Sequence, residues 1–582
     1  MLFDHELAWK DPAVYREIYV NSIAAPEKFW EYHQNTLFPE RNFNASFNCL
    51  DRHANANPNK TAIVWYGDEY CERREISYAR LLEMTERIAS ELLRRGIRKG
   101  DSVTICMPMT PESIAAMLAC CRIGAIHNVV FSGFSANALN ERIFRSASKI
   151  VITVTAGSRG GKMIPSLHNV LAAIGDMDVD ILLVDHVDDF PMDERALTAE
   201  HMKYEDPMFT LYTSGSTKEP KRIFHSCGGY QLYSAMTFKY VFDAKPEDIH
   251  FCTSDIGWIT GHSYITYAPL FLGLTLVIFS GTPMYPDGGR YWQIIENERA
   301  TIFYSAPSAI RCLASLGEES VRNYDLSSLK VLGCVGEPMN DAAWKWFFTN
   351  VGKERCPIMD TWWQTETGGI ILAPLHNVNY QKPGFASLPF FGVAPGIENE
   401  ELIIKNKNWP GLSSNFVRDD QIYHTGDKAM MDDDGDFKIL GRIDDVVNIC
   451  GHRLGTSEVE SVVNALGEVE ESAAIGIPHR IKGQALCIFV TTTSALDQEK
   501  KESVAKEIAS RIRQDIGAIA KPDKIVFITE LPKTRSGKIK RNLLKIIGKK
   551  QKVDYEGADI QSVVNAACVK EIELAMAHAI KM

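Results

Sequence analysis

Strand-like and helix-like segments alternate along residues 60–155, and this rhythm restricts the fold more than any other feature of the chain. The helix-like segments repeat apolar residues with helical spacing, and two of them begin at capping residues, Ser77 and Thr110. Alternating units of this kind build a parallel sheet with helices on both faces. We therefore predict an α/β fold with a doubly wound sheet. Its first strands are expected at 61–65, 103–107, 127–131 and 150–154.

The same texture continues beyond residue 155 and changes near residue 443. Further strands are expected at 208–212, 300–304 and 329–335. The later section is compact, with strands at 472–477, 486–492 and 525–530 and a helix at 497–516. We predict a large N-terminal domain of stacked, mostly parallel sheets (1–443), a small mobile α+β C-terminal domain (444–548) and a tail (549–582). The tail is either a docking helix or a disordered extension.

Charge and composition argue against several classes of protein. A formal net charge of −11 argues against a nucleic-acid partner, because phosphate backbones are bound by basic surfaces. No apolar run reaches the length of a membrane-spanning helix, and the first residues lack the basic start and apolar stretch of a signal peptide. The 13 cysteines follow no zinc or redox spacing, which suits a reducing compartment. We expect a cytoplasmic protein that binds neither nucleic acid nor membrane.

A hydroxyl-rich turn follows the strand expected at 208–212. Its residues offer backbone N–H groups and hydroxyls, and a glycine can adopt the positive φ that curls amides around an anion. They are Thr213, Ser214, Gly215, Ser216 and Thr217. Taken alone, this stretch fits an ordinary polar turn better than a phosphate-binding loop.

Four further motifs follow this turn in order. They are DTWWQTETGG (360–369), YHTGD (423–427), GRIDDVVNICGHRLGTSEVES (441–461) and PKTRSGK (532–538). Together with TSGST they resemble the adenylate-forming acyl-CoA synthetases, most closely the acetyl-CoA synthetases. The resemblance runs from about residue 40 to residue 545. It favours the phosphate-loop interpretation of residues 213–217.

The resemblance implies a two-step reaction with acetate, ATP and coenzyme A as substrates and Mg²⁺ as cofactor. The acid first attacks the α-phosphate of ATP and releases pyrophosphate, and the coenzyme A thiol then displaces AMP. Because the first step joins two anions, it needs cations and aimed N–H groups around the phosphates. Two alternatives stay open: a ligase for propionate or another short acid, and a nucleotide- or CoA-binding homologue with impaired turnover.

Matched motif positions imply roles around the nucleotide. Lys538 is implied as the cation of the first step, Asp427 as the acceptor of the ribose hydroxyls, and Glu366 as the Mg²⁺ ligand. Thr213 joins Lys538 and Glu366 as an implied catalytic residue. For Asp427 the alternative is a structural salt bridge with an arginine. The implied ATP contacts are Ser214, Gly215, Ser216, Thr217, Lys221, Gly336, Glu337, Pro338, Asp360, Thr361, Trp362, Trp363, Gln364, Thr365, Asp427, Arg442 and Arg453.

The resemblance also implies an acyl pocket and a path for coenzyme A. Trp363 is the implied wall of a small pocket, which favours acetate and leaves propionate possible because one methylene is hard to exclude. The other pocket residues are Ile259, Thr260 and Val335. The implied coenzyme A contacts are Gly133, Arg159, Lys162, Thr260, Ala306, Cys450 and Arg513. Asp444 is the implied hinge about which the small domain turns between the two steps.

The phosphate loop departs from the family sequence at three positions. Lys218, Glu219 and Arg222 stand where the family has glycine, lysine and glycine. A side chain at 218 or 222 disfavours left-handed backbone geometry, and Glu219 brings an anion near the triphosphate. We therefore predict slower adenylation and weaker ATP binding. Replacing Lys218 and Arg222 by glycine should raise the ATP-dependent rate, and an unchanged rate would contradict this prediction.

A lysine that is needed for turnover and lies on an exposed loop is a natural target for acylation, which removes its charge. Enzymes that acylate and deacylate Lys538 are therefore candidate partners.

Overall fold

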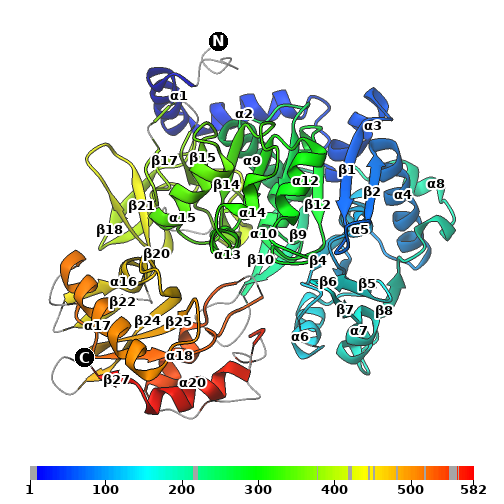
Figure 1. Cartoon of the computed structure of the whole chain (residues 1–582). Coiled ribbons are helices and arrows are strands. Elements are labelled where there is room, and N and C mark those ends of the chain that lie inside the picture. Colours follow the sequence, from blue (N-terminus) through cyan, green and yellow to red (C-terminus); the bar gives the residue numbers. More distant parts are fainter. Residues whose placement is uncertain are drawn as a thin grey trace. The chain divides into compact units, whose positions relative to one another are not determined.

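The computed structural model divides into two compact units (Figure 1). The first unit comprises Met1–Gly396, Ile403–Tyr423 and Met431–Lys438. The second unit comprises Ile397–Leu402, His424–Met430 and Ile439–Met582. The structure describes residues 10–134, 136–213, 221–375, 378–379, 381–416, 422–443, 446–449, 452–479, 483–516, 520–535, 537–549, 553, 560, 563–565 and 567–581.

A seven-stranded sheet forms one half of the first unit. Its order is β15-β14-β13-β11-β12-β1-β2, and all neighbours are parallel except β1 and β2. The strands are β1 (Thr61–Tyr66), β2 (Arg73–Ser77), β11 (Ile249–Cys252), β12 (Thr275–Phe279), β13 (Ile302–Ser305), β14 (Val331–Cys334) and β15 (Ile358–Asp360). Apolar side chains of α12 (Arg290–Glu298), α13 (Pro307–Ala314) and α15 (Asp341–Trp346) share one buried cluster with this sheet.

A six-stranded sheet of order β10-β9-β4-β3-β5-β8 forms the other half of this unit, with only β9 and β10 antiparallel. Its strands are β3 (Ser102–Ile105), β4 (Ile126–Val129), β5 (Ile150–Thr153), β8 (Asp180–Leu183), β9 (Pro207–Thr213) and β10 (Lys221–Ser226). Helix α9 (Cys227–Val241) packs between the two sheets. The ring centroid of its Tyr230 lies 4.7 Å from that of Phe209 in β9, and that of its Phe238 lies 4.8 Å from that of His250 in β11. A helix in this place is buried on nearly all sides.

The helix boundaries follow the capping residues of the sequence. Helix α4 (Tyr78–Arg94) begins after Ser77, whose hydroxyl accepts a hydrogen bond from the Arg80 N–H, and α5 (Pro111–Arg122) begins after the capping box at Thr110. The predicted helices and strands of residues 60–155 are therefore confirmed. The remaining described α-helices of the first unit with at least four residues are α1 (Pro12–Ala24), α2 (Pro26–Leu37), α3 (Arg52–Ala56), α6 (Ala136–Ser146), α7 (Ser166–Ile174), α8 (Glu194–Leu197), α11 (Ala268–Phe271) and α14 (Glu319–Arg322).

Smaller strand pairs complete the first unit and lead into the second. The hairpin β6 (Gly157–Arg159) and β7 (Lys162–Ile164) and the pair β16 (Leu372–Ala373) and β17 (Leu388–Pro389) belong to the first unit. The chain passes between the units within a four-stranded sheet of β18 (Pro395–Glu398), β19 (Glu401–Ile404), β20 (Tyr423–Met431) and β21 (Phe437–Arg442).

The second unit is a three-layer α/β/α arrangement around a sheet of order β23-β22-β25-β26-β27, with β24 also pairing β25. Alternate residues of β25 face opposite layers: Cys487 and Phe489 pack with α18 and α20, whereas Leu486 and Ile488 pack with α16 and α17. The strands are β22 (Val446–Ile449), β23 (His452–Gly455), β24 (Val469–His479), β25 (Gly483–Thr492), β26 (Lys524–Phe527) and β27 (Ile580–Lys581). The helices are α16 (Thr456–Val463), α17 (Gln498–Asp515), α18 (Arg541–Gly548) and α20 (Ala567–Ala577).

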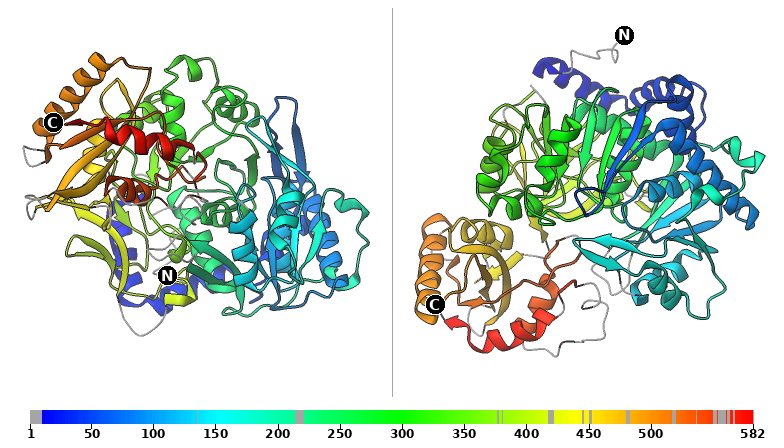
Figure 2. Two further views of the ribbon diagram at one scale, coloured as in Figure 1. Left: turned by 90° about the horizontal axis from the view of Figure 1, so that it is seen from below. Right: turned by 45° about the vertical axis from the view of Figure 1, so that its right-hand side comes forward.

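The described part of the tail is folded into this second unit. Helix α20 and strand β27 lie against the strands of the unit in both views of Figure 2. Strand β27 pairs antiparallel with β26 through Ile525 and Ile580. This part of the tail is therefore an ordered layer of the small unit, and the expectation of a disordered extension does not hold for it.

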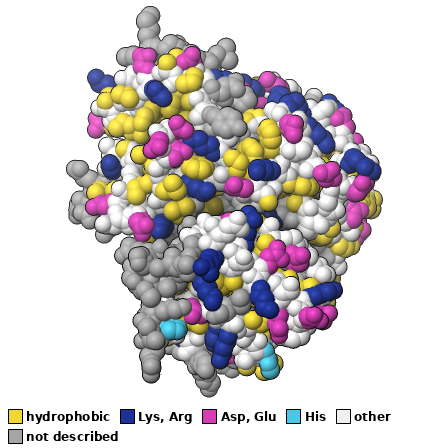
Figure 3. Space-filling model, turned by 60° about the vertical axis from the view of Figure 1, so that its left-hand side comes forward, with side chains coloured by type: hydrophobic (Ala, Val, Ile, Leu, Met, Phe, Trp, Pro, Cys, Tyr) yellow, Lys and Arg dark blue, Asp and Glu magenta, His cyan; other side chains and the backbone are white. Residues whose placement is uncertain are grey.

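Charge is mixed on the face drawn in Figure 3, where basic and acidic side chains lie interspersed with apolar ones. Among the described residues, no helix combines the length and the apolar character needed to span a lipid bilayer.

Buried histidines make the stability of the first unit depend on pH. His225 and His262 both contact the Phe209 ring, and burial lowers the pKa of His225 to about 4 and that of His262 to about 3. Below the ordinary pKa of 6.5, the unfolded chain takes up protons that the folded chain does not. The free energy of unfolding therefore falls as the pH drops below that value.

We expect each of these two histidines to remove about 1.5 kcal/mol of unfolding free energy between pH 6.5 and pH 5. Urea titrations followed by tryptophan fluorescence measure this effect, because all 10 tryptophans lie in the first unit. Replacing His225 by glutamine should flatten the pH dependence in this window. A slope that stays the same in this variant would contradict the assignment.

Candidate active site

The carboxyl ends of three neighbouring parallel strands bring residues predicted for coenzyme A (Ala306), the acyl pocket (Val335) and ATP (Asp360) to one edge of the seven-stranded sheet. Strand β13 ends just before Ala306, β14 just before Val335, and β15 at Asp360. Open α/β sheets bind their ligands at this edge. The strand order therefore brings together segments that are far apart in the sequence.

The predicted adenine turn is an exposed bend after β14. Gly336 has φ +101°, a conformation that disfavours any side chain, and Gly336, Glu337 and Pro338 are all exposed. The Glu337 carboxylate pairs with Arg311 of α13 at 2.8 Å. Because the Glu337 carboxylate is engaged in this pair, the turn presents mainly its backbone N–H and carbonyl groups to a ligand.

Two buried tyrosines brace Trp363, and the sequence analysis missed both. The indole Nε1 of Trp363 donates a hydrogen bond to the Tyr304 hydroxyl at 3.4 Å, and the Tyr264 ring meets the indole edge to face at 5.0 Å. The Tyr304 hydroxyl also bonds the Thr361 hydroxyl at 2.6 Å. The half-buried indole of Trp363 is therefore held in a defined place beside the strand ends.

Asp360 lies beneath this edge. Its side chain is 5% exposed, and the Cys334 thiol donates to it at 3.2 Å. Burial raises the pKa of Asp360 to about 7. The neighbouring Trp362 is also buried, and its backbone N–H bonds the Leu372 carbonyl of β16. Both residues support the segment that carries Trp363.

Glu366 lies in a short 3₁₀ turn, Thr365–Thr367, that other segments hold in place. His225 bonds the Thr365 carbonyl at 2.8 Å, and the Glu366 carbonyl accepts from the Ser413 N–H at 2.8 Å. The Gln364 amide oxygen accepts from the Tyr423 hydroxyl at 2.7 Å. The Glu366 carboxylate is half-buried and has no ion-pair partner in the described part of the chain.

The predicted acyl-pocket residues Ile259 and Thr260 lie in a single helical turn that leads into the segment of Tyr264. Thr260 is 8% exposed and Ile259 is half-buried. The Ser263 hydroxyl donates to the Gly368 carbonyl at 3.0 Å. This turn is therefore packed against the same segment that carries Trp363 and Glu366.

Arg159 and Lys162 face each other across the β6–β7 hairpin. The Arg159 guanidinium pairs with the buried Asp255 carboxylate at 2.8 Å and lies over the Phe131 ring, two residues before Gly133. The Lys162 side chain is exposed. Of these two hairpin residues, Lys162 is exposed to solvent, whereas Arg159 is half-buried.

The tip of this hairpin is fastened by Asp68, a residue that the sequence analysis did not single out. Its buried carboxylate accepts from the N–H groups of Gly160 at 2.9 Å and Gly161 at 3.0 Å, and also from the Ser158 hydroxyl. Both glycines have positive φ. The hairpin that presents Lys162 is therefore anchored to the loop after β1.

The phosphate-loop prediction falls mostly outside the described residues. Ser214, Gly215, Ser216 and Thr217 lie there, and Thr213 is described only by its backbone in β9. The described flanks show that the loop joins two antiparallel strands, with Lys221 paired to Thr213. No helix begins directly after the loop, because β10 spans Lys221–Ser226.

The expected strain at Arg222 is wrong. Arg222 lies inside β10, opposite Tyr212, and is not among the described residues with positive φ. Extended backbone accepts any side chain, so the change from glycine to arginine costs no strain here. The guanidinium instead lies over the Phe224 ring at 4.2 Å. The prediction of a faster enzyme on removing strain therefore rests on Lys218 alone.

In the second unit, Asp427 lies on β20 and is 7% exposed. Its N–H bonds the Thr425 hydroxyl at 3.0 Å, and that hydroxyl donates to the Leu402 carbonyl at 2.6 Å. Arg442 ends β21 and Arg453 lies in β23, and both are described only by their backbones. Asp444 and Cys450 lie outside the described residues.

Lys538 lies in a tight hairpin of the second unit. The Thr534 N–H bonds the Lys538 carbonyl at 2.8 Å, and the Lys538 N–H bonds the Thr534 hydroxyl at 3.2 Å. Gly537 turns the chain with φ +81°. The Lys538 side chain is exposed, as is Arg513 in the last turn of α17. The hairpin thus presents an ammonium group to solvent from a backbone held by hydrogen bonds.

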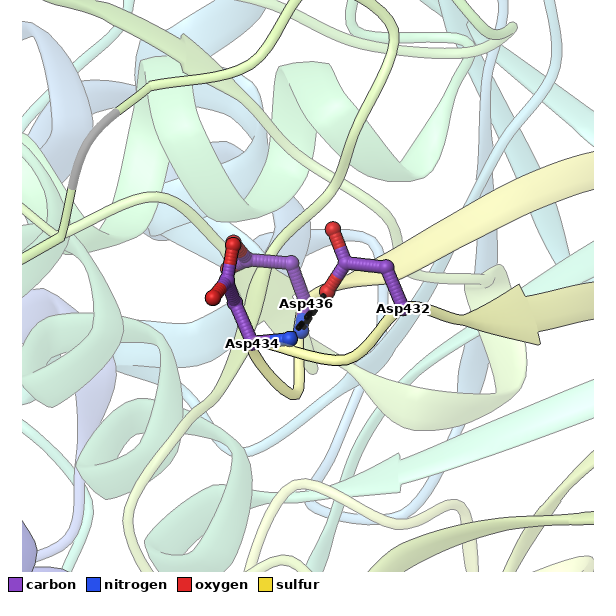
Figure 4. A group of neighbouring side chains, drawn as sticks. All are labelled: Asp432, Asp434 and Asp436. Carbon is purple, nitrogen blue, oxygen red and sulfur yellow. Dashed lines mark hydrogen bonds between the residues drawn. The ribbon is translucent and has the colours of Figure 1, made fainter.

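A cluster of three aspartates between β20 and β21 has the geometry of a metal site (Figure 4). Asp432, Asp434 and Asp436 all pair with the Lys382 ammonium, which lies 2.6, 2.6 and 2.9 Å from their carboxylates. These carboxylates raise the pKa of Lys382 well above its usual value. The cluster is therefore an internal ion-pair network.

The chain combines a large, mostly parallel α/β unit with a small α/β unit that carries an exposed lysine on a hairpin. The profile of the AMP-binding enzyme family matches residues 50–411, and that of the AMP-binding enzyme C-terminal domain matches residues 458–538. The chain belongs to the AMP-binding enzyme family.

Curated relatives match almost the whole chain. The acetyl-coenzyme A synthetase of Bradyrhizobium diazoefficiens is 43% identical over 93% of this chain and 93% of its own length. That of Xanthobacter autotrophicus is 43% identical over 94% of this chain and 93% of its own. The solved acetoacetyl-CoA synthetase from Streptomyces lividans superposes with a TM-score of 0.85 over 99% of this chain and 97% of that chain, at 20% identity. This likeness shows the shared fold.

Proposed function

We propose that the protein ligates acetate to coenzyme A in two ATP-dependent steps. A carboxylate oxygen of acetate attacks the α-phosphorus of ATP, and the bond to pyrophosphate breaks. The thiolate sulfur of coenzyme A then attacks the acetyl carbon, and AMP leaves. The observation that carries this proposal is the 43% identity to acetyl-coenzyme A synthetases across 93% of both chains.

The acyl site is proposed at the strand edge that carries Trp363. An indole braced by Tyr304 and Tyr264 cannot swing aside without losing a hydrogen bond and an aromatic contact. A fixed wall of this size leaves room for a very short acid, which supports acetate as the substrate. Ile259, Thr260 and Val335 complete the proposed pocket.

The roles proposed at the nucleotide are Gly336 for the adenine, Asp427 for the ribose hydroxyls, and Thr213, Arg442, Arg453 and Lys538 for the phosphates. Lys538 supplies positive charge where the acetate and phosphate oxygens approach each other. Mg²⁺ neutralises charge on the triphosphate in reactions of this type. Glu366 fits such a cation, because it offers a hard oxygen donor whose carboxylate has no ion-pair partner among the described residues.

Coenzyme A is proposed to approach along the β6–β7 hairpin. The exposed Lys162 is suited to one of its phosphates, and Arg159 supports that surface through its pair with Asp255. Gly133, Ala306, Cys450 and Arg513 are the remaining proposed contacts. Asp444 is proposed as the hinge between the two steps.

The cell compartment and the protein partners are also proposals. All cysteines that the structure describes are free thiols, which supports a reducing compartment such as the cytoplasm. The exposed Lys538 is accessible to enzymes that acylate and deacylate lysine.

The proposal is tested by measuring pyrophosphate, AMP and thioester products with acetate, propionate or butyrate, each with and without coenzyme A. We expect thioester and equal amounts of AMP and pyrophosphate with acetate, less with propionate, and little with butyrate. A preference for propionate would overturn the choice of substrate. Binding of ATP without any product would favour the turnover-impaired homologue instead.

A further inference from the structure

The lysine hairpin is held on its outer edge by the tail of the chain. Thr534 forms an antiparallel β-bridge with Val563, on the side opposite the bridge between Lys533 and Ile539. The Val564 N–H donates to the Lys533 carbonyl at 2.9 Å. The strand that leads to Lys538 is therefore paired on both of its edges.

Asn565 makes the side-chain contacts of this junction. Its amide nitrogen donates to the Leu531 carbonyl at 2.9 Å and to the Glu530 carboxylate at 2.7 Å. Its amide oxygen accepts from the Lys533 N–H at 3.3 Å. One side chain thus satisfies backbone groups on both sides of Pro532, at the base of the hairpin.

The tail is itself fixed to the core of the second unit, so it can hold the hairpin. Val563 is 6% exposed, and Val569 and Ile572 of α20 are fully buried in the cluster that contains β24 and β25 residues. The Glu571 carboxylate accepts from the N–H and the hydroxyl of Thr529 at 3.1 and 2.5 Å. These contacts fix both the tail and the segment before the hairpin to the same helical layer of the second unit.

We propose that Asn565, together with the backbone of Val563 and Val564, is a positioning element that sets where the Lys538 hairpin stands. This inference rests on the proposed function, in which Lys538 serves the first step. An ammonium group stabilises the reacting oxygens only if it reaches them in a narrow range of positions. Loosening the base of the hairpin therefore impairs adenylation and spares the later attack by the thiol.

The experiment compares Asn565→Ala with Val564→Ala in the full chain. Val564 is the matched control, because its side chain is 61% exposed and its contribution is a backbone N–H that alanine keeps. We expect Asn565→Ala to slow acetate-dependent ATP–pyrophosphate exchange about 10- to 100-fold. Thioester formation from supplied acetyl-adenylate and coenzyme A should stay within about twofold of the parent, and Val564→Ala should change neither.

Deuterium uptake gives a second readout that needs no catalysis. In Asn565→Ala, amides of residues 531–540 should exchange faster, whereas those of β24 should keep their protection if the unit stays folded. Equal losses in both half-reactions, or unchanged exchange kinetics and unchanged uptake, would overturn the inference. If the parent itself shows no acetate-dependent exchange, the proposed function fails, and the uptake of residues 531–540 alone decides this inference.

Asn565→Asp serves as a second variant. It keeps an acceptor for the Lys533 N–H, but it loses both donated bonds and places a carboxylate beside that of Glu530, so faster uptake is expected there as well.

Discussion

Replacing Lys538 by alanine is expected to slow formation of acetyl-adenylate about 10²- to 10³-fold. The side chain projects from a hairpin whose backbone is closed by bonds between Thr534 and Lys538, so alanine removes the charge without removing those bonds. The reaction brings a carboxylate toward a phosphate, and the loss of a cation leaves their repulsion uncompensated. Rates of pyrophosphate release under single-turnover conditions measure the effect.

The matched control is Lys521→Ala, which removes another exposed lysine of the same unit. It should leave both half-reactions unchanged. In Lys538→Ala, transfer of the acetyl group from supplied acetyl-adenylate to coenzyme A should continue near the parental rate. Equal damage to both half-reactions would contradict a role confined to the first step.

Replacing Trp363 by glycine is expected to change the substrate preference. In the proposed acyl site the indole blocks the path of a longer acyl chain, and each added methylene that finds room is worth about 1–3 kcal/mol. The ratio of kcat/KM for valerate to that for acetate should therefore rise about 10²-fold or more. Steady-state kinetics with acids of two to six carbons measure this ratio.

Trp363→Phe is the graded control, because a phenyl ring keeps part of the wall. It should admit propionate and butyrate more than the parent does and admit longer acids less than glycine does. A folded Trp363→Gly variant with the parental order of acids would show that another residue limits the pocket.

Most strands and helices could be predicted from local patterns, whereas their pairing could not. Periodicity identified the strands at 61–65 and 103–107, but β1 pairs with β12, where Ile63 lies opposite Leu276. Strand β2 was not predicted, because its RREIS sequence is largely exposed and lacks an apolar signal. Pairing between such distant segments depends on packing of the whole unit, which no local spacing contains.

The site divides in the same way. Motif positions indicated Trp363 and Lys538, but the groups that hold them are remote in sequence: Tyr304 lies 59 residues before Trp363, and Asn565 lies 32 residues after Lys533. Asp68 lies 92 residues before Gly160. The composition of the hydroxyl-rich loop did not indicate that an antiparallel strand follows it. Because Arg222 lies in that strand, with extended backbone, the strain expected there is absent.

The tail illustrates a further limit. The sequence left the tail open between a docking helix and a disordered extension, and the structure has a helix there, α20, but a sequence pattern does not reveal which surface covers an apolar face. Only the packing of Val569 and Ile572 shows that this face lies on the small unit.

The most direct measurement is the exchange of labelled pyrophosphate into ATP with Mg²⁺ and acetate present and coenzyme A absent. If the ammonium of Lys538 brings the acetate and phosphate anions together, ATP should become labelled in the parent only when acetate is present. This labelling should be nearly lost in Lys538→Ala. Thioester synthesis without any such exchange, or exchange that survives in Lys538→Ala, would contradict the account.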